Sequence, residues 1–72
     1  MTGDEWIQAF ADHLGVERPE RAEVEALLDL AGVAAHASER TAAPIACWLI
    51  GRAGLDPEDA LDQARLIRRT DS

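Results

Sequence analysis

The residues with the greatest chemical potential lie in the segment H-A-S-E-R-T, residues 36–41. His36 and Glu39 are three residues apart, so they can share a face at a helix end, and a histidine–carboxylate pair can bind a metal or transfer a proton. Arg40 carries five donors in a fixed fork that suits a phosphate or a carboxylate. Thr41 precedes a predicted helix whose first N–H groups would be free to bind an anion. We therefore take His36, Glu39, Arg40 and Thr41 as candidate ligand-binding residues.

The sequence does not complete this group into a catalytic or metal centre. A zinc site needs three or four ligands, whereas the chain has two histidines and one cysteine, Cys47, within an apolar segment. A thiol in such a segment packs as a small hydrophobic group. Gly-rich phosphate loops, H-E-x-x-H and C-x-x-C are absent from the sequence. We predict no catalytic residue, no metal and no cofactor, and an enzyme is the least favoured interpretation because its site would have to be completed at a subunit interface.

The charge of the chain is acidic and unevenly distributed. Fourteen acidic residues face seven basic ones, all arginine, for a net charge of −7. Residues 1–39 hold nine of the acids against two arginines, and residues 40–72 hold five of each sign. Nucleic acid is therefore not an expected partner, because binding phosphates requires a positive surface. With no signal peptide and no apolar run near the roughly 20 residues of a membrane span, we expect a cytoplasmic protein that does not enter a membrane.

The segment Thr41–Gly54, T-A-A-P-I-A-C-W-L-I-G-R-A-G, predicts a short helix around which the chain is organised. Thr41 is a suitable N-cap, Pro44 falls in the first turn, and Gly54 suits a helix end. The helix is apolar nearly all the way round, and such a helix must be covered on most sides. We expect the other segments to provide most of that cover.

Local signals predict three further helices. Thr2 and Glu5 fit a capping box for a helix over 3–14 that ends at Gly15. A second helix begins at residue 19 or 20 and ends near residue 37, with a buried face of Val24, Leu27, Leu28, Ala31, Ala34 and Ala35. Gly32, in its middle, suggests a close helix crossing. A fourth helix over 57–69 follows Asp56 as N-cap, has Ala60, Leu61, Ala64 and Ile67 as its buried face, and ends with Arg65, Arg68 and Arg69.

These elements predict an all-α fold, a compact bundle of four short helices in a single domain over residues 1–72. No segment alternates with the period of two that indicates a strand. Core packing is the default for Trp6 and Trp48. Trp48 lies away from some of its apolar neighbours, however, and Leu30 and Val33 lie off the main stripe of the second helix. We therefore predict Trp48, Leu30 and Val33 as an interface with a protein partner or a second copy of the chain.

The stretch from Leu27 to Gly51 resembles an uncharacterised family of small actinobacterial helical domains. The family pattern is L-D-L-A, then A-H-x-x-E-R-x-x-A-P and an apolar helix, and it is matched by Leu28 to Ala31, Ala35, His36, Glu39, Arg40, Ala43 and Pro44. The opening D-E-W-I is matched as well. The chain departs from the pattern at Cys47 and Trp48, where relatives more often have threonine and phenylalanine.

The resemblance implies a function only indirectly. Members of that family occur alone or fused to a nucleotidyltransferase-like domain resembling the molybdenum-cofactor guanylyltransferase MobA, and they have no assigned activity. The resemblance implies an accessory or protein-interaction domain associated with molybdenum-cofactor nucleotide transfer, with a MobA-like nucleotidyltransferase as partner. The alternative is a small ligand-binding module that holds an anionic group at the N-terminus of the third helix.

Overall fold

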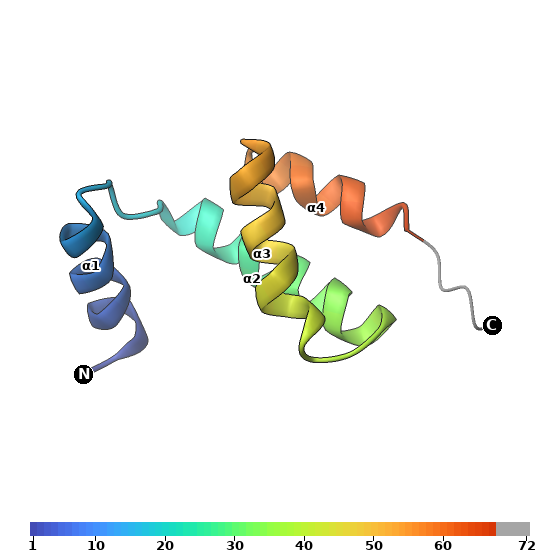
Figure 1. Ribbon diagram of the computed structural model, residues 1–72, viewed down its shortest axis with the longest axis horizontal. Helices are drawn as coiled ribbons and strands as arrows, with labels where there is room; N and C mark the ends of the chain where they lie inside the picture. Colours follow the sequence, from blue (N-terminus) through green and yellow to red (C-terminus); the bar gives the residue numbers. More distant parts are fainter. Residues whose placement is uncertain (68–72) are drawn as a thin grey trace.

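A computed structural model describes residues 1–67 of the chain (Figure 1). These residues form four helices and no strand, so the predicted all-α fold of four short helices is confirmed. The helices are α1 (Gly3–Leu14), α2 (Arg21–Ala37), α3 (Ala42–Ala53) and α4 (Pro57–Arg65). The connections between successive helices are short.

The helix ends follow the signals in the sequence closely. At the start of α1, the Thr2 N–H donates to Glu5 Oε1 at 2.7 Å, and the Glu5 N–H donates to Thr2 Oγ1 at 3.1 Å. Gly15 ends α1 with φ of 74° and Gly54 ends α3 with φ of 71°, a left-handed conformation that glycine adopts without steric cost. Asp56 caps α4, since its Oδ2 accepts the Glu58 N–H at 3.1 Å. The predicted caps at these positions are confirmed.

The last helix is shorter than predicted. It ends at Arg65 rather than at residue 69, because the Leu66 N–H donates to the Gln63 carbonyl and the Ile67 N–H donates to the Ala64 carbonyl. Bonds of this i to i−3 type tighten and finish a helix. Ile67 is exposed and is not part of the buried face. Arg68 and Arg69 lie outside the described residues.

The centre of the fold is α2, and the prediction that α3 is the covered helix is wrong. α2 packs against both α3 and α4, and its Leu30, only 2% exposed, forms the core with Ala60 and Leu61 of α4. From α3, Ala46, Cys47 and Ile50 pack against this core, yet no residue of α3 is buried. With one neighbour packed along it, α3 is covered on the α2 side and exposed on the other.

The buried face of α2 also differs from the predicted one. Ala26 and Leu30 are buried, whereas Leu28 is 67% exposed. Leu28 lies two residues before Leu30, about 200° away around the helix, so both cannot face the same core. Because α3 and α4 pack on the Leu30 side, Leu28 is left in solvent. A Cβ added to Gly32 would meet nothing within 4 Å, so the predicted close crossing at Gly32 is wrong.

The first helix is set apart from the other three. α1 lies beside the N-terminal end of α2, and α2, α3 and α4 form the packed part of the molecule (Figure 1). Of the α1 residues only Ala11 is buried, and Trp6 is 56% exposed. The expectation that Trp6 packs in the core is therefore wrong, because no other helix of the described chain covers the apolar stripe of α1.

Candidate protein-interaction surface

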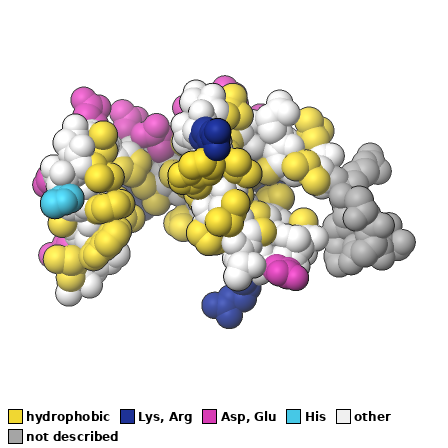
Figure 2. Space-filling view, viewed as in Figure 1, with side chains coloured by type: hydrophobic (Ala, Val, Ile, Leu, Met, Phe, Trp, Pro, Cys, Tyr) yellow, Lys and Arg dark blue, Asp and Glu magenta, His cyan; other side chains and the backbone are white. Residues whose placement is uncertain are grey.

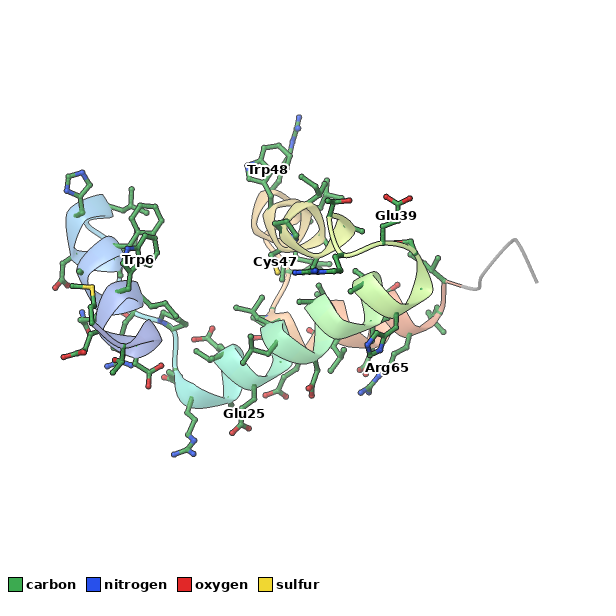
Figure 3. The ribbon with its side chains drawn as sticks, turned by 90° about the horizontal axis from the view of Figure 1, so that it is seen from below. Trp6, Glu25, Glu39, Cys47, Trp48 and Arg65 are labelled. Atoms are coloured by element: carbon green, nitrogen blue, oxygen red, sulfur yellow. The ribbon has the colours of Figure 1, made fainter. Side chains whose placement is uncertain are left out.

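The outer side of α3 carries an exposed apolar surface, which we call the α3 patch: Ile45, Trp48, Leu49 and, at its edge, Arg52. These positions are spaced by three or four residues and therefore share one face of the helix. Trp48 is 59% exposed and projects from the side of α3 opposite Cys47, which faces α2 (Figure 3). The fold thus places the largest side chain of α3 in solvent.

Arg52 fixes the chemistry of the α3 patch. Its Cζ atom lies 5.1 Å from the centroid of the Trp48 ring, within the range of a cation–π contact. The guanidinium lies over the indole ring, and this contact holds the long Arg52 side chain beside the exposed apolar residues. Tryptophan and arginine are enriched among the residues that dominate binding energy at protein interfaces. The α3 patch therefore has the composition of a protein-binding surface.

A second exposed apolar surface lies on α1, and we call it the α1 patch: Trp6, Phe10, Leu14 and the adjoining Val16. The rings of Trp6 and Phe10 are in contact, with centroids 4.9 Å apart and planes inclined at 35°. All four residues are exposed. Trp6 lies on the side of α1 nearer α3 (Figure 3).

The two patches appear on one face of the molecule. Figure 2 shows hydrophobic side chains gathered over α1 and again over α3 on the same side, with a basic side chain beside the α3 group. Contiguous exposed apolar surface of this kind marks interaction sites in soluble proteins. The sequence singled out Trp48 alone. The remaining members had a signal in their spacing, because Ile45, Trp48, Leu49 and Arg52 fall on one helical stripe.

Two other residues predicted at the interface are core residues. Leu30 is the largest fully buried side chain of residues 1–67 and offers no surface to a partner, so its prediction as an interface residue is wrong. Val33 is half-buried and packs against the core that Leu30 forms with α4. Both residues face inward for the same reason, since α3 and α4 pack on the Leu30 side of α2.

The four candidate ligand-binding residues lie at the turn between α2 and α3, where all four are exposed. Within residues 1–67, the side chains of His36, Glu39, Arg40 and Thr41 form no hydrogen bond or ion pair. Glu39 points into solvent (Figure 3). The fold brings the four residues to one turn and does not converge them on a common point.

The backbone donors expected at the N-terminus of α3 are already used. The Ala42 N–H donates to the Glu39 carbonyl at 2.9 Å, and the Ala43 N–H donates to the Arg40 carbonyl at 3.1 Å. Pro44 has no N–H to offer. Thr41 has helical φ and ψ of −67° and −16°, and its side chain caps nothing. Thr41 is therefore at the predicted N-cap position of α3 but provides no side-chain cap, and the two N–H groups expected to bind an anion are satisfied within the turn.

Other polar groups of the described chain form shallow depressions at the link between α1 and α2. Arg18 lines both of them, beside Asp4. Among residues 1–67, no three His, Cys, Asp or Glu side chains are grouped as a metal would require. In the same part of the chain, no helix has the length and apolar character needed to span a bilayer.

A comparison with family models places the chain. Residues 1–71 match the model of a domain of unknown function, DUF6457. The chain belongs to the DUF6457 family. The match extends over nearly the whole sequence, which confirms that the protein is a small domain of an uncharacterised family. No curated protein and no solved structure matches this DUF6457 domain.

Proposed function

We propose that this DUF6457 domain is a small non-enzymatic accessory domain of the cytoplasm that binds a protein partner through the α3 patch. The observation that carries the proposal is Trp48, more than half exposed at the centre of the patch, with the Arg52 guanidinium lying on its ring. An exposed tryptophan costs free energy in water that a partner would recover by covering it.

The partner that we propose first is a MobA-like nucleotidyltransferase of molybdenum-cofactor synthesis, encoded in an actinobacterium. The support is the resemblance carried by the A-H-x-x-E-R-x-x-A-P pattern, whose members include fusions to such an enzyme domain. A domain that is fused to an enzyme in some proteins is a reasonable partner of that enzyme when the two are separate chains. The acidic N-terminal half of the domain would favour a partner surface with an excess of basic residues.

The test is binding of the purified domain to a purified MobA-like nucleotidyltransferase from the same genome, measured by isothermal titration calorimetry. We expect a complex that Trp48→Glu weakens at least tenfold, because a carboxylate cannot be buried unpaired at the centre of an apolar interface.

The matched control is Leu28→Glu, which places the same charge on another exposed apolar residue, in α2 and outside the α3 patch. Leu28→Glu should leave binding unchanged. If the wild-type domain does not bind the enzyme, this enzyme is not the partner. If Trp48→Glu binds as well as the wild type, the α3 patch is not the binding surface.

The alternative, a ligand-binding module at the N-terminus of α3, has weaker support. Its arginine, Arg40, is exposed, but the Ala42 and Ala43 N–H groups that would complete an anion site donate to backbone carbonyls. An anion at this turn would have to break both hydrogen bonds before it could bind there. The interaction function is therefore the one we develop.

A further inference from the structure

We propose that, when no other partner is bound, the two apolar patches are covered by a second copy of this chain, in a two-fold dimer in which the α1 patch of each copy covers the α3 patch of the other. This inference rests on the proposed role of the α3 patch as an interaction surface and adds a second occupant of that surface. Three observations carry it: the exposed area, the position of α1, and the charges of the two helices.

The exposed area matches that of an uncovered interface. The chain exposes 5946 Å², whereas a folded monomer of its mass, 7.8 kDa, exposes about 4,400 Å². Subtracting about 900 Å² for residues 68–72, the surface that five fully extended residues would expose, still leaves an excess of about 650 Å². Each partner in a standard stable complex buries about 800 Å². The excess is therefore comparable to one side of one such interface.

α1 is isolated from the other helices, so its exposed apolar stripe requires cover from a partner. α1 has 12 residues, and a helix of that length is marginal in water without packing of its apolar face. Its stripe of Trp6, Phe10 and Leu14 is exposed in the single chain. The α3 patch has matching requirements, since α3 is covered only on its inner side. Each patch is therefore an apolar surface that could cover the other.

The position of the patches suits a reciprocal pairing. Both lie on one face of the molecule, over α1 and over α3 (Figure 2). A two-fold axis that passes between them would place each α1 over the α3 of the other copy, so that both patches are covered at once. Such an interface is closed and uses the same surface on both copies.

The charges of the helices favour this pairing over pairing of like helices. α1 contains Asp4, Glu5 and Asp12 and no arginine, whereas the only charged residue of α3 is Arg52. Packed helices lie about 8–10 Å apart, within about one Debye length at physiological salt. Pairing α1 with α1 would oppose acids to acids, and pairing α3 with α3 would oppose two arginines. Pairing α1 with α3 opposes acids to an arginine.

The first experiment measures the mass of the wild-type chain by sedimentation velocity over a range of concentrations. We expect a dimer, and we expect Trp6→Glu and Trp48→Glu each to raise the dissociation constant at least tenfold. Both tryptophans are more than half exposed, so neither variant should unfold the chain, and circular dichroism checks this. Leu28→Glu is the matched control and should remain dimeric. A wild type that stays monomeric up to millimolar concentration, or that forms open-ended assemblies, would overturn the proposal.

The second experiment mixes the two defective variants. In the reciprocal dimer, one Trp6→Glu chain and one Trp48→Glu chain form one intact contact between native Trp6 and native Trp48 patches. The mixture should therefore associate at least tenfold more tightly than either variant alone. Pairing of like helices predicts no recovery, because every contact in the mixed dimer would contain one altered patch. No recovery on mixing overturns the reciprocal arrangement.

These outcomes are distinct from failure of the proposed function. A monomeric chain that binds the nucleotidyltransferase through Trp48 would refute the dimer and leave the interaction function standing. A reciprocal dimer that does not bind the enzyme would refute that enzyme as partner and leave the interaction surface standing.

Discussion

Thr2 and Glu5 illustrate how two side chains determine where a helix begins. Each satisfies a backbone N–H of the other, at 2.7 and 3.1 Å, where α1 would otherwise leave donors unpaired. The hydrogen bond from the Thr2 backbone lowers the pKa of the Glu5 carboxyl below its ordinary value, and a further hydrogen bond with the Thr2 side chain lowers it too. The start of α1 is thereby coupled to pH.

We expect the helicity of α1 to decrease in acid because of Glu5. A carboxyl with a lowered pKa stabilises the folded state above its unfolded pKa, about 4.3, and this contribution is lost as the pH falls through the folded value. The measurement is far-ultraviolet circular dichroism of the wild type and Glu5→Gln from pH 6 to pH 2. The difference between the two should be largest near pH 6 and disappear in strong acid. A difference that does not change with pH would contradict the role of Glu5.

At the scale of the element, the sequence predicted most helix ends well, the C-terminal end of α4 excepted, and buried faces poorly. Ends depend on local groups, such as Asp56 before Pro57 or glycine at position 54, and these act through neighbours in the chain. Which face of a helix is buried depends on which other helix packs against it. In α2 several apolar stripes compete, and only the packing of α3 and α4 selects Leu30 over Leu28. For the candidate site, Trp48 was identified from the sequence, but the turn before α3 lacked the free donors expected there.

Gly32 destabilises the interior of α2, and replacing it with alanine should remove this cost. It lies within the helix, and a Cβ at this position would meet nothing within 4 Å. Gly32→Ala should therefore raise the free energy of unfolding by about 0.5–1 kcal/mol, measured by urea denaturation. Gly54→Ala is the control, since it also has open space around it but a φ of 71°. It should destabilise by about 1–2 kcal/mol. Destabilisation by Gly32→Ala would contradict this account of α2.

At the scale of the molecule, three helices share one small core and the fourth lies beside them (Figure 1). Only Leu30, Ala60 and Leu61 of the described residues form the buried part of this core, and the other buried residues, Ala11 and Ala26, are alanines outside it. A core of this size leaves only a small free energy of unfolding, because that free energy is the small difference between large opposing terms. Most of the large apolar side chains of the described chain lie outside it.

The core should therefore respond strongly to loss of its largest buried side chain. Leu30→Ala should lower the free energy of unfolding by about 2–5 kcal/mol, through lost burial and the cavity left between α2 and α4. Leu28→Ala makes the same chemical change at an exposed site of the same helix and should stay within about 0.5 kcal/mol. The comparison is by thermal or urea unfolding of the two variants. Equal losses would show that α4 does not pack on Leu30.

The positions of the two tryptophans also give the molecule a built-in optical reporter. The chain has two tryptophans and no tyrosine, and one tryptophan lies in each apolar patch. Nearly all of its intrinsic fluorescence therefore originates at the two surfaces that lack cover, and almost none originates in the core around Leu30. An emission spectrum of this protein reports contact with a partner, and it is nearly blind to the packing that holds the fold together.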